Sequence, residues 1–319
     1  MKRVPNLFIV GAPKSGTTSL YEYLKGHPQV FLTPVKEPCY FSADLALDKS
    51  GNFLRYGEDE ARYFALFDDA GDAKLAGEAS TRYLFSNDAP RLIHGTSPEA
   101  RIIAMLRNPV DMIHSLHAHK IAAGTEDIAD FAVALGAEDD RHAGRRMPEY
   151  SNPKLATYRD RALFGEQVER WIATFGRERV HVIVFEDMVA DPIGEFRKTL
   201  EFLGIDPDYR PESFAAHNVA HGARSPLLRR VLNSRPVQWA AWKAMPRVIG
   251  DSRTRALVRR VSQSGVSRRA VTREKVDPGL RRSLEEYYAA DVGRLSQLLG
   301  RDMAAFWFAP KTESGLNAG

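Results

Sequence analysis

The apolar residues of this chain gather in short, largely unbroken runs that are separated by longer stretches with helical spacing. Strands buried on both faces of a sheet have this character, and we expect them at residues 6–11, 29–32, 74–78, 101–106 and 180–185. Helical spacing covers residues 163–175, and Pro192 opens a further helix that Gly204 ends. Strands that alternate with helices predict an α/β fold with a central parallel sheet flanked by helices.

The first of these runs leads into a loop bounded by two glycines. Gly11-Ala12-Pro13-Lys14-Ser15-Gly16-Thr17-Thr18 follows the strand and precedes a helical pattern. Glycines let backbone N–H groups close around an anion, and the positive end of the helix dipole favours a phosphate there. We therefore predict a P-loop-like core whose anion-binding residues are Lys14, Ser15, Gly16, Thr17 and Thr18.

The position of the lysine separates two kinds of phosphate loop. A nucleoside triphosphatase loop has its lysine directly after the second glycine, and the next hydroxyl holds magnesium. Here Thr17 occupies that position, and Lys14 lies inside the loop, two residues before Gly16. This arrangement resembles the 5′-phosphosulfate loop of sulfotransferases, whose donor is 3′-phosphoadenosine 5′-phosphosulfate (PAPS). The resemblance implies that Lys14 contacts the departing phosphate.

A second phosphate site is predicted where the run 101–106 ends. Arg107 would lie at the carboxyl end of a strand and Ser115 two turns into the next helix, so both side chains can reach one phosphate. This pair resembles the sulfotransferase site for the 3′-phosphate of the donor. Sulfotransferases also carry a late loop over the adenosine and the 3′-phosphate, and at that place this chain offers Gly222 and Arg224.

The candidate base comes from Lys36-Glu37-Pro38-Cys39-Tyr40-Phe41, which resembles the branch of the family that contains the heparan sulfate sulfotransferases and bacterial relatives. That resemblance gives Glu37 the role of catalytic base, and the following proline favours an extended loop at this residue. Glu78, at a strand end, is a second candidate for the base or for orienting the acceptor. Heparan enzymes have a Glu-Lys pair there, whereas Ala79 follows Glu78 in this chain.

Histidines offer a further alternative for the base. His114, His117 and His119 follow the second phosphate site, and the resemblance to cytosolic small-molecule sulfotransferases makes His117 or His119 a candidate. Sulfuryl transfer needs an aligned acceptor, a base and positive charge on the leaving phosphate. This chemistry requires no metal, and no cysteine or histidine cluster has the spacing of metal ligands.

Positive charge is concentrated late in the chain. Residues 224–275 contain 14 Lys or Arg against two acids, although the whole chain has a net charge of only +4. Together with Trp239 and Trp242, this charge suits an anionic membrane surface, a lipid-linked acceptor or an acidic glycan. A solvated helical subdomain whose arginines pair with the acidic remainder is the alternative. No nucleic-acid-binding motif accompanies the charge, so we expect no nucleic-acid partner.

The chain is long enough for one large enzyme domain. We expect a single sulfotransferase domain over residues 1–319, with a core at about 5–205, the basic helical segment at about 224–275 and a closing helix at about 278–300. The first strand begins almost at once, so we expect no signal peptide, and no apolar run approaches the ~18 residues of a membrane span. With Cys39 as the single cysteine, we expect a cytoplasmic protein, with peripheral membrane contact as a further expectation.

These features predict a transferase that moves a sulfuryl group from PAPS to a hydroxyl group, with an amine as the second option. The expected acceptor is a carbohydrate, a glycolipid or another small molecule. A noncatalytic, membrane-associated nucleotide-binding adaptor is one alternative. A P-loop phosphotransferase is another, and there Glu186 and Asp187 at the end of the run 180–185 would hold magnesium.

Overall fold

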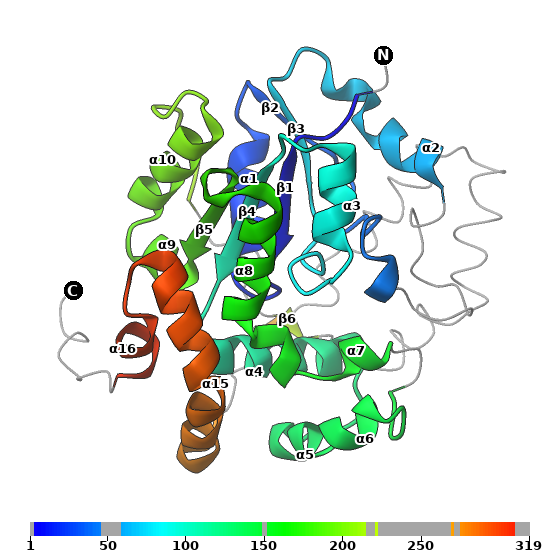
Figure 1. Cartoon of the computed structure of the whole chain (residues 1–319), viewed down its shortest axis with the longest axis vertical. Coiled ribbons are helices and arrows are strands. Elements are labelled where there is room, and N and C mark those ends of the chain that lie inside the picture. The colour runs from blue at the N-terminus through cyan, green and yellow to red at the C-terminus, as the bar shows by residue number, and fades with distance from the viewer. Residues whose placement is uncertain are drawn as a thin grey trace.

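The computed structural model describes residues 3–45, 59–148, 152–214, 221–222, 269–270 and 275–309. Its centre is a five-stranded sheet with the order β2-β3-β1-β4-β5, in which all neighbours are parallel (Figure 1). The strands are β1 (Leu7–Gly11), β2 (Val30–Leu32), β3 (Leu75–Ala79), β4 (Arg101–Leu106) and β5 (Val180–Val184). The predicted α/β class is confirmed, and each of the five strands lies within one residue of its predicted bounds.

Both faces of the sheet are buried. Side chains alternate along β1, so Phe8 and Val10 belong to one hydrophobic core and Leu7 and Ile9 to the other. The first core is completed by α3 (Ala89–Thr96), α4 (Pro109–Ala123), α8 (Phe164–Phe175) and α15 (Pro278–Leu299). The second core is completed by α1 (Thr17–Lys25) and α10 (Pro192–Leu203). Burial on both faces explains why the strands are apolar without alternation.

The longer helices begin and end at recognisable signals. Helix α10 begins at Pro192 after Asp191, whose side chain accepts a hydrogen bond from Gly194 N, and ends at Gly204 with a φ of 65°. Helix α15 ends in the same way at Gly300, with a φ of 62°. It packs against α8 and so joins the C-terminal part of the chain to the core.

The sequence did not predict the short elements. These are η1 (Ala43–Leu45), α2 (Glu60–Phe64), η2 (Ala65–Ala70), α5 (Phe131–Gly136), α6 (Glu138–His142), α7 (Pro153–Ala156), η3 (Arg159–Ala162), η4 (Arg177–Arg179), α9 (Phe185–Ala190) and α16 (Met303–Phe308), and the antiparallel pair β6 (His221–Gly222) and β7 (Arg269–Ala270). Apart from β7 and Lys275, the predicted basic segment lies outside the described residues, as does Arg224. No helix in the described ranges is long and apolar enough to cross a membrane.

The carboxyl ends of the strands define the functional edge of the sheet. The strands β1 and β4 point toward α4 and α7 in the lower half of Figure 1. The chain passes from β1 to β2 and β3 on one side and then to β4 and β5 on the other, so β1 lies where the direction of connection reverses. Ligands of open α/β sheets bind beside the carboxyl ends of the strands at such a point.

Candidate active site

The loop after β1 is held in the conformation that an anion-binding loop requires. Ala12 N donates a hydrogen bond to Met105 O at 2.6 Å, which fixes the loop beside β4. Gly16 has a φ of 91°, and a Cβ atom there would lie 3.0 Å from the ring of Phe185, so only glycine fits. Gly16 is also the N-cap of α1 and has no side chain to cap the helix. Ser19 N already donates to Gly16 O at 2.9 Å, so the N–H groups of Thr17 and Thr18 are the ones that keep their capacity to bind an anion.

The hydroxyl residues of this loop line the start of α1. Ser15 is fully buried, with its Oγ 3.4 Å from Pro13 O, and Thr17 is also buried. Thr18 is half-buried and accepts a hydrogen bond from Lys36. Lys14 is half-buried and has a φ of 61°, in the left-handed region. The predicted loop residues thus surround one helix N-terminus.

The second predicted phosphate site contains a buried hydroxyl without a partner. Ser115, on α4, is 1% exposed, and its Oγ makes no hydrogen bond with the described residues. An unsatisfied buried polar atom costs about 1–3 kcal/mol, so such an atom in a native structure indicates a missing ligand or water. Arg107, at the end of β4, is half-buried. A guanidinium and a hydroxyl are suitable donors for a phosphate.

Glu37 lies in a constrained turn and not in the extended conformation predicted for it. Its φ is 55°, as is that of Cys39, so the expectation from the following proline was wrong. Three hydrogen bonds hold this conformation: Glu37 N donates to Ala79 O at 3.0 Å, Thr81 N donates to Glu37 Oε2 at 2.9 Å, and Thr81 Oγ1 donates to Oε1 at 3.1 Å. These bonds aim the carboxylate along the edge of the sheet.

The surroundings of Glu37 alter its acidity. Glu37 is exposed, but the protein groups around its carboxylate remove part of its hydration, and this loss raises the pKa of Glu37. The bonds from Thr81 and the charges of Lys36 and Arg82 act in the opposite direction, because they favour the ionised form. A carboxylate with a raised pKa is better suited to accept a proton.

Lys36 connects the Glu37 segment to the anion loop. Its Nζ donates a hydrogen bond to Thr18 Oγ1 at 2.7 Å and lies 5.1 Å from the centre of the Tyr21 ring. Burial lowers the pKa of Lys36, whereas Glu37 and Glu22 favour its charged form. The two segments predicted to carry the base and to bind the donor are therefore in direct contact.

Glu78 is enclosed beneath this site. It is fully buried and accepts hydrogen bonds from the hydroxyls of Tyr63 and Tyr83, each at 2.8 Å, and from Ser80 Oγ at 2.6 Å. Burial raises the pKa of Glu78 to about 7 even though the three hydroxyls favour the ionised form. Ser80 Oγ also accepts a hydrogen bond from Cys39 N at 3.0 Å. This geometry favours a role for Glu78 in supporting the turn that carries Glu37.

The histidines of α4 have different surroundings. His117 is 4% exposed, its Nε2 lies 2.9 Å from Ile128 O, and its ring packs against Phe131 and Tyr158. His119 is exposed, and His114 packs against Phe131. In the part of the chain that the structure describes, no group of three or more His, Cys, Asp or Glu residues could hold a metal ion.

The acidic pair after β5 is engaged in structural contacts. Glu186 accepts hydrogen bonds from Asn108 N and from Trp307 Nε1, both at 3.1 Å. Asp187 forms an ion pair with Arg301. These carboxylates join the start of α4 to the C-terminal helices, which does not favour the magnesium role that a phosphotransferase would require.

Sequence reasoning missed several residues at this edge. Thr81 and Arg82 directly follow β3, and their place after a strand could have identified them. Lys120 on α4 and Arg161 on η3 also lie close enough to the site to interact with it electrostatically. Neither of these two belongs to a motif, so no local signal marked them.

Comparisons with known proteins give a consistent result. The profile of the Sulfotransferase family matches residues 5–209. Human heparan sulfate glucosamine 3-O-sulfotransferase 6 is 25% identical over 309 residues, covering 94% of this chain and 73% of that protein. Human carbohydrate sulfotransferase 15 is 25% identical over 274 residues, covering 71% of this chain and 48% of that protein. The chain thus spans only about half the length of some relatives.

A solved structure is similar over almost the whole chain. The crystal structure of a sulfotransferase from Alicyclobacillus acidocaldarius matches with a TM-score of 0.69 and 29% sequence identity, covering 95% of this chain and 99% of that one. The family profile covers more than half of the present chain, and the fold agrees with it. This chain belongs to the sulfotransferase family.

Proposed function

We propose that this protein transfers a sulfuryl group from PAPS to a hydroxyl group of a carbohydrate-type acceptor, with Glu37 as the base. The observation that carries the proposal is the hydrogen bond of 2.7 Å between Lys36 Nζ and Thr18 Oγ1, which joins the base-bearing segment to the first turn of α1. The names of the relatives support a carbohydrate acceptor, and "3-O-sulfotransferase" supports a hydroxyl. An N-sulfotransferase among the relatives keeps an amine as the second option.

We assign one group of residues to the 5′-phosphosulfate of PAPS and another to its 3′-phosphate. The loop residues Lys14, Ser15, Gly16, Thr17 and Thr18 would hold the 5′-phosphosulfate. Arg107 and Ser115 would hold the 3′-phosphate, which would give the buried Ser115 Oγ the partner that it lacks. Arg224 lies outside the described residues and stays a prediction from the sequence, as do a cytoplasmic location and peripheral membrane contact.

The transfer follows from these positions. Glu37 takes the proton of the acceptor hydroxyl while the oxygen of that hydroxyl forms a bond to sulfur. At the same time the bond between sulfur and the bridging phosphate oxygen breaks. The electron pair of that bond leaves with 3′-phosphoadenosine 5′-phosphate (PAP). Lys14 and the first-turn N–H groups of α1 stabilise the negative charge on this leaving group.

The test combines nucleotide binding with turnover. We expect PAP to raise the melting temperature clearly more than ATP with magnesium does. We expect the protein to convert PAPS to PAP and to form a sulfated product with a member of a panel of mono- and oligosaccharides, as measured by mass spectrometry. Glu37→Gln should lower the rate of this conversion strongly, whereas Glu201→Gln, on the exposed face of α10, should not change it.

Two outcomes would contradict the proposal. Equal thermal shifts with PAP and with ATP and magnesium would favour a phosphotransferase. If PAP binds tightly but PAPS is not converted in the presence of any acceptor, and Glu37→Gln behaves like wild type in both measurements, the noncatalytic adaptor is favoured.

A further inference from the structure

Arg161 is a buried arginine whose side chain has no polar partner among the residues that the structure describes. It lies on η3 and is 6% exposed, and its Nε is buried without a hydrogen bond. Within the described ranges its guanidinium makes no hydrogen bond or ion pair, and it lies 5.6 Å from the centre of the Phe85 ring. Burial of an unpaired charge is costly, so a fold that keeps one needs a compensating interaction.

The neighbouring charges increase this cost. Arg82 and Lys120 both interact unfavourably with Arg161, and Glu37 interacts favourably with it but forms no ion pair. Lys120 is 9% exposed, and its Nζ donates to Leu155 O and lies 4.7 Å from the centre of the Tyr158 ring. Two buried cations thus repel each other here, and one of them, Arg161, is attracted by Glu37.

The buried carboxylate of this region is already satisfied. Glu126 receives two hydrogen bonds of 2.7 Å from Arg141 and one of 2.6 Å from the hydroxyl of Tyr158. Its Oε1 also accepts from two backbone N–H groups of its own loop. Glu126 therefore neutralises Arg141, and none of these bonds goes to Arg161.

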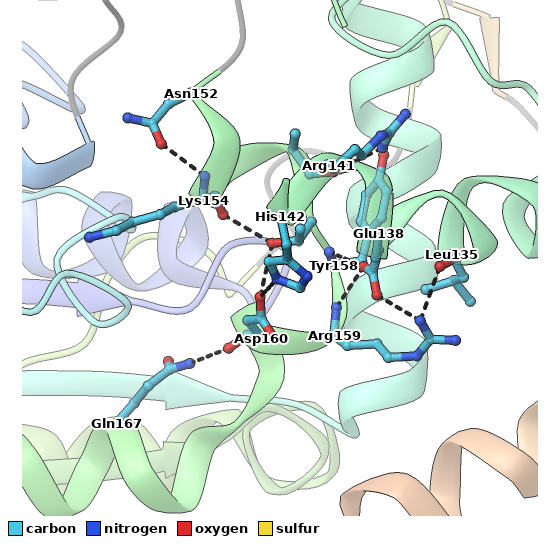
Figure 2. A network of polar contacts seen from close by, with 12 residues as sticks. Leu135, Glu138, Arg141, His142, Asn152, Lys154, Tyr158, Arg159, Asp160 and Gln167 are labelled. Carbon is cyan, nitrogen blue, oxygen red and sulfur yellow. Dashed lines mark hydrogen bonds and ion pairs between the residues drawn. The ribbon is translucent and has the colours of Figure 1, made fainter. Parts of the chain in front are cut away.

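Hydrogen bonds hold the three residues before Arg161, which are Tyr158, Arg159 and Asp160 (Figure 2). Glu138 accepts hydrogen bonds from Tyr158 N and Arg159 N and pairs with the Arg159 guanidinium at 2.8 Å. Asp160 lies 2.6 Å from His142 Nε2, and its carbonyl accepts from Gln167 Nε2 at 3.1 Å. A cation on such a rigid segment is preorganised for a ligand.

We propose that Arg161, with Lys120 beside it, binds an anionic group of the acceptor and so directs the neighbouring acceptor hydroxyl toward Glu37. The acceptor class is then a hydroxyl compound that bears a carboxylate, a sulfate ester or a phosphate ester. This inference rests on the proposed function, and it makes Arg161 a residue that selects and positions the acceptor.

Calorimetric titration of the PAP-saturated protein tests the proposal. The probes are glucuronate, glucose 6-sulfate and glucose 6-phosphate, with neutral glucose as the reference. We expect at least one anionic probe to bind more tightly than glucose, and the preferred probe identifies the anionic group. Arg161→Met should weaken its binding about tenfold or more, because a charge-assisted hydrogen bond is lost. Arg161→Lys should restore part of the affinity, and Arg197→Met, on the exposed face of α10, should have no effect.

Thermal unfolding separates acceptor binding from a structural role. Because Arg161→Met removes a buried charge that no described residue pairs with, we expect its melting temperature to stay the same or rise, with unchanged affinity for PAP. The inference is overturned if no anionic probe binds more tightly than glucose, or if wild type and Arg161→Met bind all three anions equally. Failure of wild type to bind PAP would overturn the proposed function instead.

Discussion

Arg107 donates a hydrogen bond to the backbone carbonyl of Lys14, with 3.3 Å between Nη1 and the oxygen. Its guanidinium also lies 4.8 Å from the centre of the ring of Phe185, the side chain that closes over Gly16. The loop after β1 and the end of β4 therefore form one unit. The two segments that we assign to the two phosphates of PAPS support each other before any nucleotide binds.

Arg107→Ala should weaken PAP binding about 10–100-fold, because a charge-assisted hydrogen bond contributes about 1.5–3 kcal/mol. Turnover at saturating PAPS should change much less. Arg101→Ala is a matched control, since Arg101 begins the same strand and stacks on Phe202 at 5.3 Å, at the opposite edge of the sheet. Unchanged PAP affinity in Arg107→Ala, measured by calorimetry, would show that the second phosphate site is misplaced.

Lys14→Ala should lower kcat by about 100-fold or more, because it removes a donor to the charge that develops on the leaving phosphate. Lys25→Ala is the control, because it also removes one lysine but at the opposite end of α1 from the loop. Single-turnover measurements with PAPS separate this effect from product release. A Lys14→Ala variant with the rate of the wild type would contradict the assigned role.

Glu37→Gln should lower the rate of transfer strongly while leaving PAP affinity within about twofold of wild type. The base must be ionised to act, and loss of hydration raises its pKa above the ordinary value of 4.5. We therefore expect kcat/KM of the wild type to fall as the pH decreases through this raised pKa. The residual rate of Glu37→Gln should lack that limb of the pH profile. A profile with the same acidic limb in both proteins would assign it to another group.

Glu78→Gln should change how stability depends on pH. The folded-state pKa of Glu78 is about 7, above its ordinary value of 4.5, so the folded protein holds this proton more tightly than the unfolded chain. The resulting stability is fully present below pH 4.5 and is lost as the pH rises through 7. The unfolding free energy of wild type relative to Glu78→Gln should therefore decrease over this range, as urea titrations can measure. A constant difference would show that Glu78 does not titrate there.

The sequence by itself determined the architecture of this protein and the position of the loop around Lys14. The apolar runs 6–11 and 101–106 specified strands buried on both faces, and the residues directly after them had to lie at the carboxyl edge of a parallel sheet. The loop around Lys14 could be read in the same way, since a strand, a glycine turn and a helix start are local features. These predictions held because neighbours in the chain decide them.

Only the tertiary structure decided the burial, the hydrogen bonding and the pKa of the side chains at the site. Glu37 and Glu78 are both carboxylates near strand ends, yet one reaches solvent and the other is enclosed by Tyr63, Tyr83 and Ser80. Arg161 has no sequence signal at all, and its burial without an ion pair to any described residue results from what the fold brings near it. Burial, pKa and hydrogen bonding depend on residues far apart in the chain, so packing and not sequence pattern fixed them.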